Sequence, residues 1–260
     1  MGLSRLAPVV ERLAQPSLRL TAGKASARPV TRLGGRPNLP KGTQWPTWRE
    51  APLSFIAHFS LAELPEVDGL SLPREGALFF FYDADDQPWG FDPQNKGCAR
   101  VVYDPSPLTD HPVRPFPEDV EAEVRFKGLA LTPSLEESWP SVDEIRHLEL
   151  SEEEFVAYLS REDELIHRVG GHPDAIQGGP RLMAQLVSNG LYCGDSSGYN
   201  EGLARGLDKG AGDWLLLLQV GSEERAGMMW GDMGRLYFMM HKEDLRRRCF
   251  DNVWLVLECS

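Results

Sequence analysis

Histidine and cysteine are the residue types in this chain with the most direct capacity for metal or nucleophilic chemistry. The closest histidine pair, His167 and His172, is separated by five positions with Gly170-Gly171 between them. This spacing matches neither the i, i+4 pair of a helical zinc site nor a zinc-finger pair. The four cysteines contain no Cys-x-x-Cys pair, and we expect them to be reduced and buried. The sequence therefore predicts no metal site and no cofactor.

Signals for covalent catalysis are equally weak. No Gly-x-Ser-x-Gly pentapeptide occurs, and Cys193 has no identifiable base near it in the sequence. An enzyme built on this chain would have to use Asp232, His167 or Cys193. We predict that the protein is not an enzyme, and no residue is assigned a catalytic role.

The string Trp230-Gly231-Asp232-Met233-Gly234 brings large apolar groups to a glycine-rich turn that carries one carboxylate. One interpretation is a pocket for a small molecule or peptide, lined by Trp230, Asp232 and His167. The other, which we favour, is a turn whose aspartate caps nearby N–H groups while the tryptophan covers the core.

Charge is distributed unevenly along the chain. The net charge is -12, and residues 51–165 hold 25 acidic side chains against 8 basic ones. This excludes a typical nucleic-acid binder, because contacts to phosphate require clustered Lys and Arg. It suits a protein whose partner is basic. The candidate contact residues are Glu118, Asp119, Glu121, Glu123, Glu152, Glu153, Glu154, Glu162, Asp163 and Glu164.

Apolar runs are short. The longest, Ala77 to Tyr82, is six residues, whereas a membrane span needs about 20. The first residues do not form the apolar stretch of a signal peptide, and the start of the chain lacks a complete myristoylation signal. We expect a cytoplasmic protein that does not bind membranes.

Most of the predicted elements that must position these residues are strands. Runs rich in aromatic and branched residues, bounded by Pro and Gly, predict strands at 53–59, 77–82, 98–103 and 253–257. Alternation around Val124 and Phe126 suggests another strand, and Asn189-Gly190 favours a hairpin over 181–193. Helices are expected near 4–15, at 151–165 behind a capping box, at 199–207 and at 242–248.

The chain also contains an internal repeat. Leu33-Gly34-Gly35-Arg36-Pro37 recurs as Val169-Gly170-Gly171-His172-Pro173, at an offset of 136 positions. The apolar run 55–58 resembles 216–219 at an offset of 161, and 76–81 resembles 234–239 at an offset of 158. The same order in both halves predicts a duplication.

These elements predict an α+β, mainly β fold. Two internally duplicated antiparallel sheet halves are expected to pack into one domain with a few peripheral helices. The whole chain, 1–260, is predicted to be this single domain. Its half-repeats span about 17–110 and 166–260, with an acidic insertion at 111–165.

Several segments together resemble a known family. They include TRLGGRPNLPKGTQWP, PLSFIAHFSLAEL, LPREGALFFFYD, MMWGDMGRLYFMM and DNVWLVLECS, and the similarity runs from about Thr31 to Cys259. On these residues the chain is similar to the YwqG-like family of bacterial proteins, a domain of unknown function. The resemblance implies a mainly β, duplicated fold and supplies no catalytic residues.

The resemblance also suggests a function, because some relatives resemble immunity proteins that protect a bacterium from a type VI secreted nuclease. The leading hypothesis is an immunity protein that binds and neutralises a cognate toxin with a basic surface. The alternatives are a small-molecule or peptide-binding protein with its pocket near Trp230–Gly234, and an uncharacterised enzyme.

Overall fold

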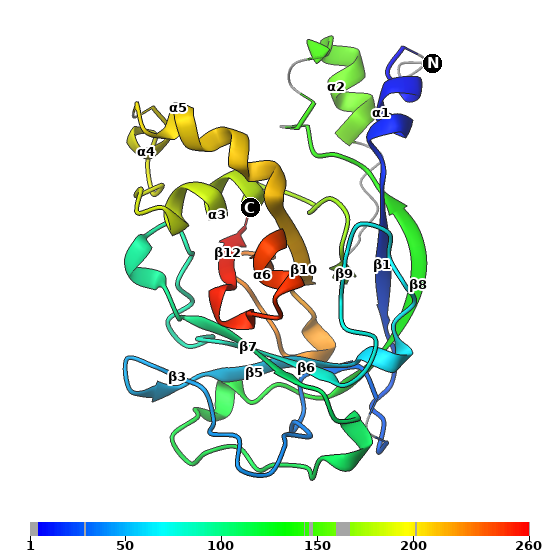
Figure 1. Ribbon diagram of the computed structural model, residues 1–260, viewed down its shortest axis with the longest axis vertical. Helices are drawn as coiled ribbons and strands as arrows, with labels where there is room; N and C mark the ends of the chain where they lie inside the picture. The colour runs from blue at the N-terminus through cyan, green and yellow to red at the C-terminus, as the bar shows by residue number, and fades with distance from the viewer. Residues whose placement is uncertain are drawn as a thin grey trace.

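The computed structural model describes residues 5–28, 30–142, 144–145, 148–159, 167–200 and 202–259 (Figure 1). The strands are β1 (Gln15–Ala22), β2 (Arg32–Leu33), β3 (Thr47–Trp48), β4 (Ala51–Pro52), β5 (Ser54–Ser60), β6 (Ala77–Tyr82), β7 (Ala99–Asp104), β8 (Leu129–Ser138), β9 (His167–Val169), β10 (Trp214–Gly221), β11 (Arg235–His241) and β12 (Trp254–Glu258). The α-helices are α1 (Ala7–Leu13), α2 (Glu152–Leu159), α3 (Pro180–Ser188), α4 (Ser197–Asn200), α5 (Ala204–Leu207) and α6 (Lys242–Arg246).

Ten of these strands form one sheet in the order β12-β11-β10-β9-β1-β8-β2-β5-β6-β7, and β3 pairs with β4 in a small second sheet. Neighbouring strands are antiparallel throughout the large sheet. The predicted α+β, mainly β fold is therefore confirmed. Within the described residues, every helix is too short or too polar to span a lipid bilayer.

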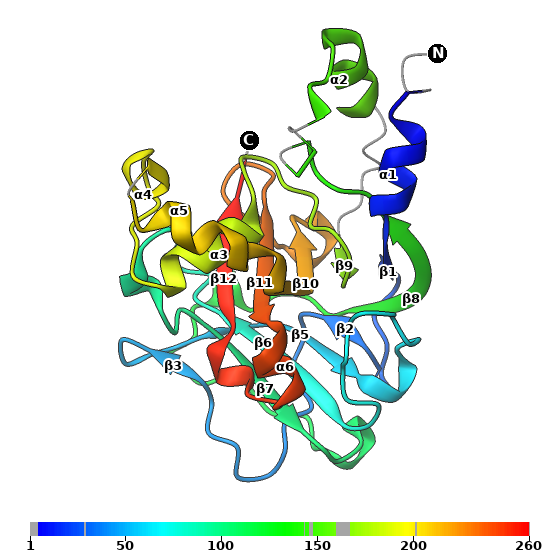
Figure 2. The ribbon, with the colours of Figure 1, turned by 45° about the horizontal axis from the view of Figure 1, so that its top comes forward.

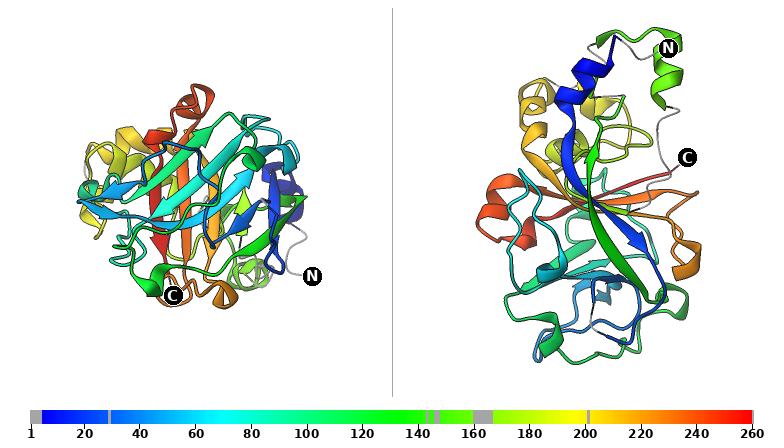
Figure 3. Two further views of the ribbon diagram at one scale, coloured as in Figure 1. Left: turned by 90° about the horizontal axis from the view of Figure 1, so that it is seen from below. Right: turned by 90° about the vertical axis from the view of Figure 1, so that its right-hand side faces the viewer.

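The two ends of the sheet face each other, and their strands cross in the view from below (Figure 3, left). Alternation explains this packing, because successive side chains on a strand point to opposite faces. On β6, Phe80 points into the main core, whereas Phe79 and Phe81 point to the outer face. Phe80 meets Phe238 of β11 edge to face, with ring centroids 5.3 Å apart.

The strand register supports the duplication. Arg32 of β2 lies opposite His58 of β5, and Arg168 of β9 lies opposite Gln219 of β10. His58 and Gln219 are therefore equivalent at an offset of 161, which is the offset of the sequence repeat. Both β5 and β10 also carry a register irregularity at the same relative position.

The central strands are exchanged between the two halves. β1 precedes β2 in the chain but pairs with β8 and β9, and β8 precedes β9 but pairs with β1 and β2. The contact between β1 and β8 runs from Gln15, opposite Ser138, to Ala22, opposite Leu131. The segment 111–165, predicted as an insertion, thus contains β8 at the centre of the sheet, and the halves are interlocked.

Two local predictions were wrong. The hairpin expected over 181–193 is instead helix α3, followed by the turn at Asn189 and Gly190. Gly190 has a positive φ, and the backbone N–H groups of Gly190 and Leu191 donate to Val187 and Leu186, so Asn-Gly here ends a helix. Around Val124 the chain forms a short 3-10 helix, η4 (Ala122–Val124), not a strand.

Helices cover the two halves unequally. α3 and α5 pack on the outer face of β10, β11 and β12, whereas mainly loop side chains cover the outer face of β5 and β6. α1 and α2 stand side by side beyond the end of β1 and β8 (Figures 1 and 2). The described residues of 5–14 and 139–159 are called the helical lobe from here on.

Candidate functional site

A polar network lies beneath the second Gly-Gly turn. Arg168 of β9 is only 3% exposed. Its guanidinium donates to the carbonyl oxygen of His172 at 3.1 Å and forms ion pairs with Asp174 and, at 3.2 Å, with Glu136. A buried arginine is stable only when its charge and its donors find such partners. The network therefore fixes the turn against the sheet.

Asp174, just after this turn, is held from several sides. Its backbone N–H donates to Gln219 Oε1 at 2.9 Å, and Gln219 Nε2 donates to its carboxylate at 2.7 Å. Its carbonyl oxygen accepts from Arg235 at 2.8 Å and from the hydroxyl of Tyr237. Strands β10 and β11 thus anchor the segment 173–179 that leads into α3.

His172 joins the second half to the helical lobe. Its Nδ1 lies 2.8 Å from Glu144 Oε2, and its Nε2 lies 2.8 Å from the carbonyl oxygen of Leu13 at the end of α1. These two contacts connect His172 to both parts of the lobe. The side chain thus links α1, the lobe and the sheet.

Glu144 also pairs with Arg181 of α3, at 3.2 Å from Oε1. Burial acts to raise the pKa of Glu144, but the hydrogen bond and charge of His172 and the charge of Arg181 hold it below its usual value. Arg181 donates further to Gln15 Oε1 and to the carbonyl oxygen of Gly171, both at 2.9 Å. Arg181, His172 and the carboxylate of Glu144 therefore meet here.

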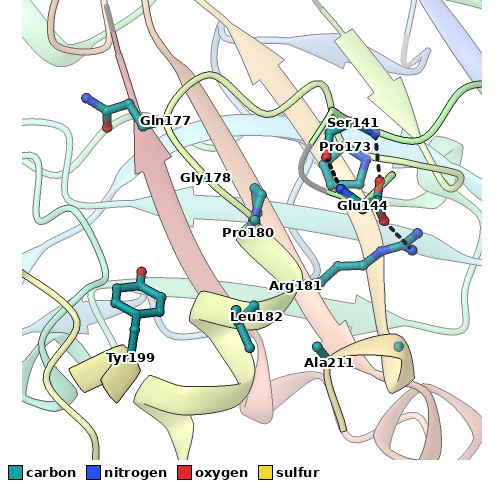
Figure 4. A pocket seen from close by; sticks show the side chains of 12 residues that line it. Ser141, Glu144, Pro173, Gln177, Gly178, Pro180, Arg181, Leu182, Tyr199 and Ala211 are labelled. Atoms are coloured by element: carbon teal, nitrogen blue, oxygen red, sulfur yellow. Dashed lines mark hydrogen bonds and ion pairs between the residues drawn. The ribbon is translucent and has the colours of Figure 1, made fainter. Parts of the chain in front are cut away.

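A cavity of about 680 Å³ opens beside this cluster. It is lined by Ser141, Glu144, Pro173, Gln177, Gly178, Gly179, Pro180, Arg181, Leu182, Tyr199, Ala211 and Gly212. Figure 4 shows Ser141, Glu144 and Arg181 gathered at one end and Tyr199 at the other, with Pro180 and Leu182 between. The walls come from the lobe, from the start of α3, from α4 and from the segment before β10.

The helical lobe has a small core of its own. Leu6, which precedes α1, Val10 of α1, Ile145 and Tyr158 of α2 are buried together. The Tyr158 hydroxyl donates to the carbonyl oxygen of Pro140 at 2.7 Å. The predicted capping box is present at the start of α2. Ser151 Oγ accepts from the backbone N–H of Glu154 at 3.2 Å, and Glu154 accepts from that of Ser151 at 3.0 Å.

Comparison with known proteins gives one finding. A family model described as "Domain of unknown function (DUF1963)" matches residues 31–259. The chain belongs to this family. A search of curated proteins found no match. The matched range of the DUF1963 chain includes strands β2 to β12, the cavity and α2, and begins after α1 and β1.

In this DUF1963 chain, the residues predicted to line a pocket do not come together around one. Trp230 is fully buried, its ring packs against Tyr82 and Phe126, and its Nε1 donates to the carbonyl oxygen of Gly221. Asp232 is exposed. Trp230 therefore fills the core, as the interpretation that we favoured requires, but the capping expected of Asp232 is absent among the described residues.

His167 is 2% exposed and its Nε2 lies 3.9 Å from Glu223 Oε2. The thiol of Cys193 is buried, 3.9 Å from the carbonyl oxygen of Leu191. Asp232 makes no hydrogen bond or ion pair with any other residue in the described part of the chain. Across those same residues, no three His, Cys, Asp or Glu side chains form a group suited to a metal ion.

The predicted contact residues fall into separate groups. Glu118, Asp119, Glu121 and Glu123 are exposed around η4, and Glu152 and Glu153 are exposed on α2. The carboxylate of Glu154 already has partners within the protein, because it pairs with Arg5 at 2.8 Å and caps its own helix. Glu162, Asp163 and Glu164 lie outside the described residues.

β8 separates the first two groups. It begins a few residues after η4 and leads to the lobe, and ten residues of strand span about 30 Å. The two acidic groups therefore lie at opposite ends of the molecule (Figure 1).

Sequence reasoning missed Glu144 and Arg181 entirely. They come from segments 37 positions apart, and neither belongs to a motif. His172 was noticed only as part of the repeat. The one available signal was the difference between the repeats, in which Arg36 and Asn38 correspond to His172 and Asp174.

Proposed function

We propose that this DUF1963 protein is a cytoplasmic immunity protein. It binds a cognate secreted antibacterial toxin with a basic surface, such as a nuclease, and neutralises it by protein–protein contact rather than by catalysis. The proposal draws on the acidic composition and on the resemblance to immunity proteins described above. One structural observation carries the choice of contact surface, and it concerns α2.

The outward side of α2 combines exposed acidic and apolar side chains. Glu152 and Glu153 are exposed in its first turn, and Phe155 and Val156 beside them are 41% and 57% exposed. An aromatic group surrounded by charges is the composition of a protein interface: the apolar part slows dissociation and the charges speed association. The helix also stands clear of the sheet, so that a partner can reach it.

The acidic group near η4 lacks this combination. Its residues 118–123 carry four exposed carboxylates, but the hydrophobic neighbours Val120 and Phe126 are buried. A toxin domain that contacts α2 would have to extend about 30 Å along β8 to reach it. The proposal therefore places the contact on the helical lobe.

The test is co-expression of the protein with the candidate toxin encoded beside it, followed by measurement of survival and of the association rate. The double substitution Glu152→Lys and Glu153→Lys should slow association at low salt by about tenfold or more, because it reverses the steering charge. Glu154 is left unchanged, since its replacement would remove the cap of α2.

The matched control is Glu118→Lys with Glu121→Lys, which changes the net charge equally at the other end of the molecule. Its association rate should remain within about threefold of that of the original protein. Equal slowing by both variants would show that only total charge matters and would exclude the lobe as the contact surface. If cells that express the toxin die equally with and without the protein, the immunity function is lost altogether.

A further inference from the structure

The cavity beside Glu144 and Arg181 lies apart from the outward side of α2 and is not used by the proposed function. Its volume of about 680 Å³ lies within the range of small-molecule sites, about 300–1,000 Å³. Its middle is apolar, with the ring of Pro180 and the side chain of Leu182 (Figure 4). The cavity therefore offers apolar walls with polar groups concentrated at one end.

Three glycines line this cavity at positions where neither the backbone conformation nor the packing requires a glycine. A Cβ on Gly178 would come no closer than 3.9 Å to Glu258 Oε1, one on Gly179 no closer than 3.7 Å to Leu182, and one on Gly212 would meet nothing within 4 Å. None of the three has a positive φ. Backbone geometry and packing would thus accept side chains here, and those side chains would project into or beside the cavity.

The polar end offers hydrogen-bond donors. The guanidinium of Arg181 lies there, paired with the carboxylate of Glu144. The first turn of α3 adds to this, because the backbone N–H groups of Arg181 and Leu182 have no acceptor among the described residues. Gly178 and Gly179 likewise present N–H groups without a partner within that part of the chain.

From the cavity, its open glycine wall, Arg181 and the unpartnered N–H groups at the start of α3, we propose that the site binds a small organic acid. The acid group, a carboxylate or phosphate, lies against Arg181 and the start of α3, and the apolar body lies between Pro180, Leu182 and the ring of Tyr199. Burial, with the charge of Glu258 adding, raises the pKa of Tyr199, so its hydroxyl stays neutral.

The test uses four probes of equal ring size on the full-length protein: benzoate, phenyl phosphate, benzyl alcohol and benzylamine. Affinities are measured by titration with NMR detection of the backbone amides. Benzoate or phenyl phosphate should bind at least about tenfold more tightly than benzyl alcohol, and benzylamine more weakly still. The comparison of the two acids identifies which acid group the site prefers.

Site-filling variants connect the binding to this cavity. Gly178→Leu and Gly212→Leu, which both line the cavity, should each weaken benzoate binding by about tenfold or more while the thermal unfolding curve stays cooperative. Gly202→Leu is the matched control, because a Cβ there meets nothing within 4 Å and the residue does not line the cavity. Equal affinity for acid, alcohol and amine, absence of binding by every probe, or unchanged binding by both filled variants would overturn the proposal.

Discussion

The Gly-Gly turns of the two halves share a backbone arrangement but differ in their surroundings. In both, the arginine before the turn donates to the carbonyl oxygen at its end: Arg32 to Arg36, and Arg168 to His172. In the second half the arginine also has two carboxylate partners. In the first half Nε of Arg32 has no partner in the described structure, and burial and the charge of Arg36 lower its pKa.

The residues around the two turns also differ, since those of the first half are more apolar. The first half places Phe79 and the fully buried Leu39 near its turn, where the second half has Tyr237 and the half-buried Ala175. The first turn thus continues into an apolar plug, and the second continues into a hydrogen-bonded segment that forms a cavity wall. One backbone motif can therefore lie against a packed apolar plug in one copy and beside a cavity in the other.

The largest expected effect is on the arginines. Arg168→Met should lower the free energy of unfolding by about 3 kcal/mol or more, because Glu136 and Asp174 lose the partner of their charges. Arg32→Met should cost about 1 kcal/mol or less, since only one hydrogen bond to a carbonyl is removed. Urea unfolding of both variants measures the difference, and equal losses would contradict the contrast between the halves.

The second effect concerns the glycines. Gly171→Ala should cost about 2 to 3 kcal/mol, because φ is +66° and the new Cβ would overlap Ser138 Oγ and lie 2.8 Å from Ser17 Cβ. Gly35→Ala has φ +71° but a nearest contact of 3.1 Å, to Gly128, so about 1 kcal/mol is expected. Thermal unfolding at matched pH compares the two variants. A larger loss of stability for Gly35→Ala would mean that the first turn, not the second, is the more tightly packed one.

A smaller effect is expected when the second half is made more like the first. Tyr237→Phe removes the hydrogen bond to the carbonyl oxygen of Asp174 and should cost about 1 kcal/mol. Hydrogen exchange in 173–179 should become faster at the same time. Tyr103→Phe is the control, because its hydroxyl makes only a 3.4 Å bond in an exposed position. Unchanged exchange in 173–179 would show that Tyr237 does not anchor the segment.

The sequence sufficed for features that depend on local pattern. Strands such as 77–82 follow from unbroken aromatic runs, and the equivalence of His58 with Gln219 follows from the repeat. The helix α3 was missed because Asn189-Gly190 closes a helix as readily as a hairpin. The exchange of β1 and β8 was missed because β8 contains Pro133, and its exposed residues hide the strand pattern.

The candidate site was harder to predict from the sequence than the fold. Glu144, His172 and Arg181 meet only because the lobe folds back onto the second turn, a contact between segments with no common sequence signal. Composition did indicate the acidic surfaces, yet it could not show that they lie at opposite ends of β8. Which of them presents apolar groups beside its charges depends on packing alone.

The last prediction concerns His58 in the first half. Its effect on stability is seen on acidification and vanishes at neutral pH, where it is therefore the smallest of those expected. His58 is fully buried, and burial, with the charge of Arg32 adding, holds its pKa well below the ordinary value of 6.5. The folded state therefore keeps this ring neutral while the unfolded chain takes up a proton, so His58 stabilises the fold above pH 6.5 and less as the pH falls below it. The equivalent residue in the second half, Gln219, cannot titrate.

The substitution His58→Gln separates this effect from that of the other histidines. Stability of the original protein and of the variant is measured by urea unfolding between pH 7.5 and 5. The variant should lose less stability on acidification, whatever its stability at pH 7.5, because the difference between the two slopes reports the proton taken up at position 58. Parallel slopes would mean that His58 is protonated in the fold, and the apolar character assigned to the first turn would then be wrong.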